Sequence, residues 1–209
     1  MAKSKNDEIL TKIIGEPLMV RHIEICGAIA SGKTTLAQAF SKISLFPVLE
    51  DCSNIASLAD FYKNQRKYAF ETEISFTLHH YYQAKKALLN ARGVVCDFSF
   101  VGDYAFATAT LNKHEFFIYK PMFDYLLSKL GKPDKLIILQ ASTETLLKRI
   151  MSRNRAVEKH ISAEYLDVTT AALYKAIKII YSDVPSIIIN TEKVHSEKYT
   201  LAFLKELLR

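Results

Sequence analysis

The sequence GAIASGKT, residues 27–34, decides the fold class of this chain. It matches the pattern G-x-x-x-x-G-K-[ST] of a phosphate-binding loop, and it lies between the apolar segment RHIEIC (21–26) and the helix-like segment KTTLAQAFSKI (33–43). Glycines let such a loop turn its backbone N–H groups inward, and the N-terminus of the following helix adds a positive dipole end. We therefore predict that this loop binds the phosphates of a nucleotide.

Each position of the loop has an expected part in binding ATP. The set comprises Gly27, Ala28, Ile29, Ala30, Ser31, Gly32, Lys33, Thr34 and Thr35. Lys33 is expected to reach the β- and γ-phosphates and to act in catalysis, and the hydroxyl of Thr34 is expected to ligate Mg²⁺. The loop alone does not name the reaction. The D-x-x-G and N-K-x-D patterns of GTPases are missing from the sequence, which leaves the small kinases.

Outside the loop, short apolar segments alternate with segments of helical periodicity. The segments interpreted as strands are 21–26, 46–50, 94–98, 135–140 and 186–190, and those interpreted as helices are 33–43, 67–91, 114–130, 142–153, 162–181 and the residues from 196. This alternation is typical of a parallel sheet covered on both faces. We predict an α/β, P-loop kinase fold with five parallel strands. Pro121 is expected to kink or break its helix.

Composition bounds the class of protein. A chain of 209 residues suits one domain, which we place at residues 20–209 after a lead-in of residues 1–19. The net charge of +6 is modest and the basic residues form no aromatic-laced stripe, so a nucleic-acid-binding module is disfavoured. No apolar run is long enough to cross a bilayer. Three widely spaced cysteines predict neither a disulfide framework nor a zinc site, and indicate a cytoplasmic protein.

Four segments taken together resemble the deoxynucleoside kinase family, of the bacterial deoxyadenosine and deoxyguanosine kinase type. They are GAIASGKTT (27–35), LADFYKNQRKYAFETEISF (58–76), VVCDFSFVGDYAFA (94–107) and LQASTETLLKRIMSRNRAVEKHISAEYL (139–166). The resemblance extends from about residue 21 to residue 181. It implies a homodimeric enzyme that transfers the γ-phosphoryl group of ATP to the 5′-hydroxyl of a deoxynucleoside, assisted by Mg²⁺.

The resemblance also assigns roles to acids and arginines near the reacting groups. Glu50 stands at the position of the general base that accepts the proton of the 5′-hydroxyl. Asp97 matches an acid that assists Mg²⁺ binding. Arg149, Arg153 and Arg155 match the arginines of a lid over ATP, and of these Arg149 and Arg153 are expected to act in catalysis and Arg155 at the substrate.

Substrate-binding residues follow from the same resemblance. Tyr62 and Glu158 match a pair that binds the sugar 3′-hydroxyl, and Glu73, His80 and Asp103 match positions near the base. Glu73 and His80 are seven residues apart, so they share one helix face; packing or exposure of His80 is the alternative to a base contact. An ionised Glu73 offers acceptors only, which suits the adjacent N1–H and 2-amino donors of guanine. We therefore predict a purine preference, with deoxyguanosine above deoxyadenosine.

Two departures from the family pattern bear on the alternatives. Phe98 stands where the family carries an arginine that contacts the reacting 5′ region, and His80 stands where another arginine is usual. A nucleoside monophosphate kinase of the thymidylate kinase type needs arginines for its acceptor phosphate, so these two positions disfavour it. A nucleotide-binding regulator without phosphoryl transfer is the second alternative, and the acids Glu50 and Asp97 speak against it.

Overall fold

The computed structural model describes residues 20–193 and 196–209, so the predicted lead-in at residues 1–19 lies outside the described residues. One parallel sheet has the strand order β2-β3-β1-β4-β5. The strands are β1 (His22–Gly27), β2 (Phe46–Val48), β3 (Val94–Cys96), β4 (Lys135–Gln140) and β5 (Ser186–Asn190). The prediction of an α/β fold with five parallel strands is confirmed. Strands β2 and β3 each end two residues earlier than predicted.

Helices connect all of these strands. They are α2 (Lys33–Ala39), α3 (Leu58–Lys63), α4 (Gln65–Asn90), α5 (Phe100–Thr110), α6 (Lys113–Leu130), α7 (Thr143–Arg153), α8 (Ala163–Ile180) and α9 (Leu201–Glu206), with short 3₁₀ turns at Phe40–Ile43, Cys52–Asn54, Ala156–Glu158 and Ser196–Lys198. Ser142 and Ser162 accept hydrogen bonds from backbone N–H groups at the starts of α7 and α8, as their positions in the sequence predict. No helix among the described residues is long and apolar enough to span a membrane.

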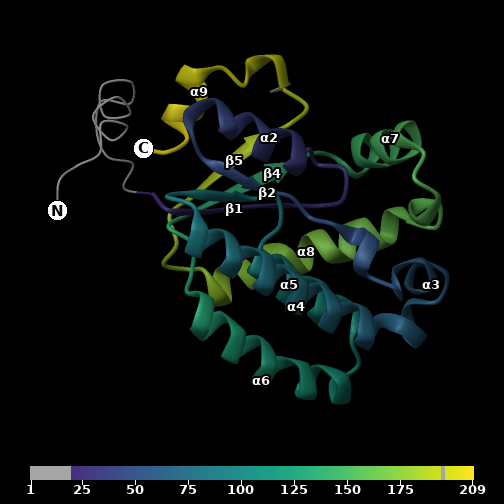
Figure 1. Ribbon diagram of the computed structural model, residues 1–209. Coiled ribbons are helices and arrows are strands. Elements are labelled where there is room, and N and C mark those ends of the chain that lie inside the picture. Colours follow the sequence, from purple (N-terminus) through teal and green to yellow (C-terminus); the bar gives the residue numbers. More distant parts are fainter. Residues whose placement is uncertain (1–19, 194–195) are drawn as a thin grey trace.

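Successive side chains of β1 point to opposite faces of the sheet, and each face carries its own part of the apolar core. Ile23 and Ile25 pack with α2 and α9 on one face, and Cys26 packs with α5, α6 and α8 on the other. Figure 1 shows α2 and α9 above the sheet and α4, α5, α6 and α8 below it. The buried Glu24 also belongs to β1, and its carboxylate accepts hydrogen bonds from the Tyr181 hydroxyl (3.0 Å) and the Phe100 backbone N–H (3.2 Å).

Pro121 lies inside α6, which continues through it to Leu130. The expectation that this proline could break the helix is therefore wrong. Pro121 cannot donate a backbone hydrogen bond to the carbonyl of Phe117, one turn earlier. Phe117 is 79% exposed and Pro121 is itself exposed, so water can solvate the freed carbonyl on this side of the helix.

The strand order places β1 at the centre of the sheet, and the chain turns to opposite sides of it. After β1 the chain forms β2 and β3 on one side, and then crosses to β4 and β5 on the other. In parallel α/β sheets, ligands bind at the carboxyl ends of the strands where the strand order reverses. The phosphate loop follows β1 directly, so it lies at this point. Helices α3 and α7 lie beyond the same end of the sheet (Figure 1).

Candidate active site

A cavity of about 560 Å³ opens at the carboxyl ends of the strands. Its walls come from the phosphate loop, from α3, α4, α5 and α8, and from the segment that begins in α7 and ends at Glu158. Of the site residues expected from the sequence, all except Ala28 line this cavity. Residues spread between positions 27 and 158 are therefore brought to a single place.

At its first residue, the phosphate loop adopts a backbone conformation that only a very small residue allows. Gly27 has φ +146°, and a Cβ atom there would lie 2.6 Å from the Leu139 backbone oxygen and 2.7 Å from Ser31 Oγ. The Lys33 ammonium donates to the backbone oxygens of Gly27 (3.0 Å) and Ala28 (3.1 Å), which holds it over the loop. Ser31 Oγ is buried and has no hydrogen-bond partner within residues 20–193 and 196–209. A polar atom left unpaired in this way suits a loop that receives an oxygen-rich ligand.

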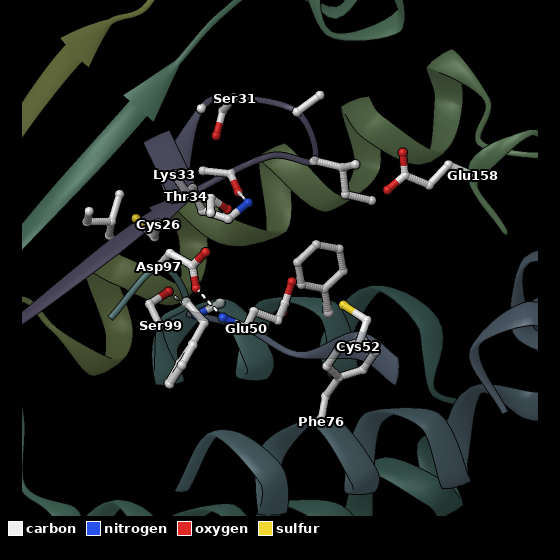
Figure 2. A pocket seen from close by; sticks show the side chains of 18 of the residues that line it. Cys26, Ser31, Lys33, Thr34, Glu50, Cys52, Phe76, Asp97, Ser99 and Glu158 are labelled. Carbon is white, nitrogen blue, oxygen red and sulfur yellow. Dashed lines mark hydrogen bonds between the residues drawn. The ribbon is translucent and has the colours of Figure 1, made fainter. Parts of the chain in front are cut away.

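Two oxygen ligands stand beside the loop. The Thr34 side chain is hydrogen-bonded to the Asp97 carboxylate, and Asp97 Oδ1 accepts from the Glu50 backbone N–H at 2.6 Å. Figure 2 shows Lys33, Thr34, Asp97 and Glu50 gathered together in the cavity. Mg²⁺ in phosphate-binding sites typically takes one or two protein oxygens together with phosphate oxygens. The hydroxyl and carboxylate present therefore fit a magnesium ion bound with ATP.

Glu50 reaches the cavity from the connection that follows β2. Its Oε1 lies 3.1 Å from His80 Nε2, and its side chain is 32% exposed, facing the open cavity. Burial raises the pKa of Glu50, but the hydrogen bond and charge of His80, together with the charge of Lys33, lower it to about 2. Glu50 is consequently ionised throughout the physiological range. Asp51, and not Glu50, caps the following 3₁₀ turn.

His80 lines the cavity and is bonded to carboxylates on both sides. Its Nδ1 lies 2.9 Å and 3.1 Å from the two carboxylate oxygens of Asp103, and its ring stacks on Phe98 with the centroids 4.1 Å apart and the planes 4° apart. Both ring nitrogens are therefore engaged by carboxylates, Asp103 on one side and Glu50 on the other. His80 and Asp103 line the cavity, and their polar atoms bond to each other and to Glu50. A contact of His80 with the base stays a prediction.

Glu73 lies on the same face of α4 and is only 4% exposed. Burial raises its pKa to about 8, which outweighs the hydrogen bond from Thr110. Thr110 Oγ1 lies 2.9 Å from Glu73 Oε1 and 2.9 Å from the Phe106 backbone oxygen, and its one proton can serve only one of them. A protonated Glu73 lets both hydrogen bonds form. Burial therefore favours the neutral carboxyl group near neutral pH, and the sequence does not reveal how deeply this group is buried.

The three arginines expected in a lid have three different environments. Arg149 donates to the backbone oxygen of Thr191 (2.8 Å) and to its hydroxyl (3.0 Å). Arg153 makes a two-pronged ion pair with Glu158, with nitrogen–oxygen distances of 2.6 and 2.7 Å. The side chain of Arg155 is 59% exposed, with its Nη1 3.6 Å from Glu158. Arg149 thus spans the cavity rim near the loop, while Arg153 is held by the acid expected at the sugar.

Tyr62 lies on α3 within a group of aromatic rings. Its ring centroid is 5.4 Å from that of Phe61 and 6.3 Å from that of Tyr165. Burial raises the pKa of Tyr62, and the charges of Glu158 and Glu50 raise it further. The Tyr62 hydroxyl is therefore protonated and available as a hydrogen-bond donor in the cavity.

Several residues of the site were not identified from the sequence. Thr191 follows β5 and holds Arg149, so the rule that sites form at the carboxyl ends of strands could have found it. Cys52 hydrogen-bonds to the Glu50 carboxylate, and Thr110 bonds to Glu73. Neither residue carries a motif signal. Phe98, noted only as a departure from the family, proves to be the surface on which His80 stacks.

Comparison with known proteins agrees with this arrangement. Residues 23–206 match the deoxynucleoside kinase family. The chain is 34% identical over 191 residues to a deoxyadenosine kinase of Dictyostelium discoideum (88% of this chain, 78% of the relative). It is 32% identical over 184 residues to a deoxyguanosine kinase of Bacillus subtilis (strain 168) (86% and 89%). The structure of a deoxyadenosine kinase from M. mycoides with bound dATP has the same fold, with a TM-score of 0.76, 21% identity and coverage of 90% of this chain and 99% of that one. This chain belongs to the deoxynucleoside kinase family.

Proposed function

We propose that this protein transfers the γ-phosphoryl group of ATP to the 5′-hydroxyl of a deoxynucleoside, with a preference for purines. The observation that carries the proposal is the position of Glu50. It is an ionised carboxylate that faces the cavity, and its backbone is tied to Asp97 beside the phosphate loop. An acceptor hydroxyl bound there would lie between a hydrogen-bond acceptor and the phosphates of ATP. The names of the two relatives, deoxyadenosine kinase and deoxyguanosine kinase, support the substrate class.

The donor half of the cavity would hold ATP. The loop N–H groups and Lys33 bind its phosphates, and Thr34 and Asp97 hold Mg²⁺, which neutralises charge on the phosphate oxygens. Phosphoryl transfer passes through a loose transition state in which positioning and electrostatic stabilisation supply most of the catalysis. Arg149, next to the loop, is placed to stabilise charge on the transferred group.

The acceptor half would hold the nucleoside. Glu50 accepts the proton of the 5′-hydroxyl, and the Tyr62 hydroxyl and the Glu158 carboxylate bind the sugar 3′-hydroxyl. Glu158 is engaged by Arg153 in the structure, so the sugar would compete for this carboxylate and release the Arg153 guanidinium. We infer that this exchange couples substrate binding to movement of the arginine-bearing segment toward ATP, as a lid.

Charge in the acceptor half separates this reaction from the monophosphate kinase alternative. Glu50 and Asp103 line that half, and both are bonded to His80, so neither ring nitrogen of His80 is left to bind a phosphate. A phosphate group of an acceptor monophosphate would be placed among carboxylates. A neutral nucleoside suits this environment better, because it brings no charge to be repelled.

A phosphorylation assay tests the proposal directly. The protein is incubated with ATP and Mg²⁺ and, separately, with each common deoxynucleoside, ribonucleoside and deoxynucleoside monophosphate, and the products are quantified. We expect monophosphate from a purine deoxynucleoside and no diphosphate from the monophosphates. ATP binding without any transfer would favour the regulator, and diphosphate formation would favour the monophosphate kinase.

We propose that the protonation state of Glu73 decides which purine base it can hydrogen-bond. A neutral carboxyl group offers one donor and one acceptor, which pair with N1 and the 6-amino group of adenine or with O6 and N1–H of guanine. In the complex the Glu73 hydroxyl would donate to the base in place of Thr110, and the Thr110 hydroxyl would donate to Glu73 Oε1. An ionised carboxylate offers acceptors only, which suit N1–H and the 2-amino group of guanine but face the N1 lone pair of adenine. The preference for deoxyguanosine expected from the sequence is thus confined to pH values at which Glu73 is ionised.

This reasoning predicts a selectivity that depends on pH. Because the pKa of Glu73 is about 8, the ratio of kcat/KM for deoxyguanosine to that for deoxyadenosine should rise as the pH increases through this value. A mismatched buried acceptor costs roughly 1–3 kcal/mol, equivalent to about a tenfold to hundredfold change in the ratio. Glu73→Gln, which keeps a donor and an acceptor at all pH values, is the matched control and should give a flat ratio. A wild-type ratio that stays constant from about pH 6.5 to 9 would contradict this role.

A homodimer and a cytoplasmic location, which the family resemblance implies, remain proposals. Apolar side chains exposed on the neighbouring helices α4 and α6 support the dimer, and they are Leu78, Tyr82, Leu89, Phe117, Ile118 and Tyr125. Analytical ultracentrifugation measures the state of association, and a monomer at micromolar concentration would count against the dimer.

A further inference from the structure

His80 is held by carboxylates at both of its ring nitrogens. Its Nδ1 is 2.9 Å from Asp103 Oδ1, and its Nε2 is 3.1 Å from Glu50 Oε1, while the residue as a whole is only 2% exposed. A neutral imidazole has one N–H donor and one lone pair. In this site the lone pair would point at a carboxylate oxygen, whichever tautomer formed. The doubly protonated imidazolium is therefore the state that satisfies both contacts.

The charges around the ring favour the same state. Burial by itself lowers the pKa of His80, but the charge and hydrogen bonds of Asp103 and Glu50 outweigh it and raise the pKa to about 10. Asp103 comes from α5, Glu50 from the connection after β2, and Glu73 from α4 itself. Glu73 is neutral below about pH 8, so Asp103 and Glu50 are the two anions that face the imidazolium.

Phe98 fixes the orientation of the ring. The two rings are parallel within 4° at a centroid separation of 4.1 Å, and Phe98 is buried in the connection after β3. An aromatic face next to a buried cation is also electrostatically favourable. The ring plane of His80 is thus set by stacking, and the direction of its N–H bonds by Asp103. The Nε2–H bond of His80 therefore points at Glu50 Oε1.

We propose that His80, oriented by Asp103 and Phe98, is the positioning residue that holds the Glu50 carboxylate toward the acceptor hydroxyl. The inference rests on the proposed kinase function. Glu50 is anchored at three points, its backbone N–H by Asp97, its Oε1 by His80 and its carboxylate by Cys52. A carboxylate offers about four acceptor sites, so Glu50 can still accept the substrate hydrogen bond. An imidazolium has no lone pair, so His80 acts by orientation and charge and does not relay the proton.

Steady-state kinetics test the positioning role. His80→Gln keeps a donor but loses the charge and the stacked ring, and we expect kcat to fall about tenfold to a hundredfold, as misplacement of a reacting group does. The KM for ATP should stay unchanged, because His80 does not touch the phosphate loop. Asp103→Asn should lower kcat in the same direction by a smaller factor, since Nδ1–H keeps an acceptor. His114→Gln, on the exposed surface of α6, is the matched control and should behave as wild type.

Nitrogen-15 NMR of the histidine side chains gives a second measurement on the wild-type protein. The His80 signals, assigned by their loss in His80→Gln, should show both ring nitrogens protonated at about pH 7.5. A neutral His80 ring overturns the inference, and so does an undiminished kcat in folded His80→Gln. If the wild-type protein phosphorylates no nucleoside, the proposed function fails and the positioning role with it. Normal wild-type turnover combined with a normal His80→Gln overturns the positioning role alone.

Discussion

Glu50→Gln is expected to lower kcat by about 10²–10⁴-fold, the range typical for loss of a positioned general base, with little change in nucleoside affinity. The amide cannot accept a proton at neutral pH. In this site it has a further defect, because the His80 Nε2–H lies 3.1 Å from Glu50 Oε1 and would select the amide oxygen. The amide NH₂ would then face the substrate hydroxyl. That hydroxyl can accept a hydrogen bond from the amide, so binding persists, but its own proton has no acceptor.

The measurement separates turnover from binding. Initial rates give kcat, and calorimetric titration with the nucleoside gives the dissociation constant. Asp51→Asn is the matched control, because it removes the same charge one residue away and an asparagine can still cap the following turn. If Glu50→Gln lost affinity and kept its turnover, Glu50 would be a binding residue and the proton would leave by another route.

Lys33→Ala is expected to reduce phosphoryl transfer by on the order of 10³-fold or more, comparable to or greater than the loss of one electrostatic donor at a transition state. The Lys33 ammonium is held at the loop by the backbone oxygens of Gly27 and Ala28, at 3.0 and 3.1 Å. It is therefore already placed where the β- and γ-phosphates would bind. Its side chain lines the cavity and does not belong to the apolar core, so the fold should persist.

Two readouts check this prediction together. Product formation should fall to near background, while the thermal unfolding midpoint should stay close to that of the wild-type protein. Lys205→Ala, on the exposed side of α9, removes the same charge far from the loop and serves as the control. Near-normal turnover in folded Lys33→Ala would be incompatible with the phosphate-loop mechanism.

Local patterns in the sequence were sufficient to predict those parts of the structure that interactions between neighbouring residues decide. The loop at residues 27–34, the alternation of apolar strands with helices, and the capping residues Ser142 and Ser162 each depend on a few consecutive residues. Their predictions agree with the structure for that reason. The helix continues through Pro121 because a proline is tolerated when the carbonyl it frees faces solvent, and exposure is a property of packing.

The resemblance to a family brought the site residues together in advance, but it did not reveal what they contact. His80 and Phe98 each stood out singly as departures from an arginine, and only the folded chain shows that they stack on one another. Residues from α4 and from the connection after β3 meet there, separated by 18 positions in the sequence. No periodicity or motif encodes such a pair.

The sequence by itself determined the fold class and the phosphate loop, because these follow from short motifs and hydrophobic periodicity. The acids and arginines expected around the substrates came from the resemblance to a family. Only the tertiary structure decided the charge states. Glu50 and Glu73 are the same residue type, yet one has a pKa lowered to about 2 by His80 and Lys33, and the other a pKa raised to about 8 by burial. The physical reason is that an ionisation equilibrium depends on solvation and on charges within a few ångströms, and distant segments of the chain supply both.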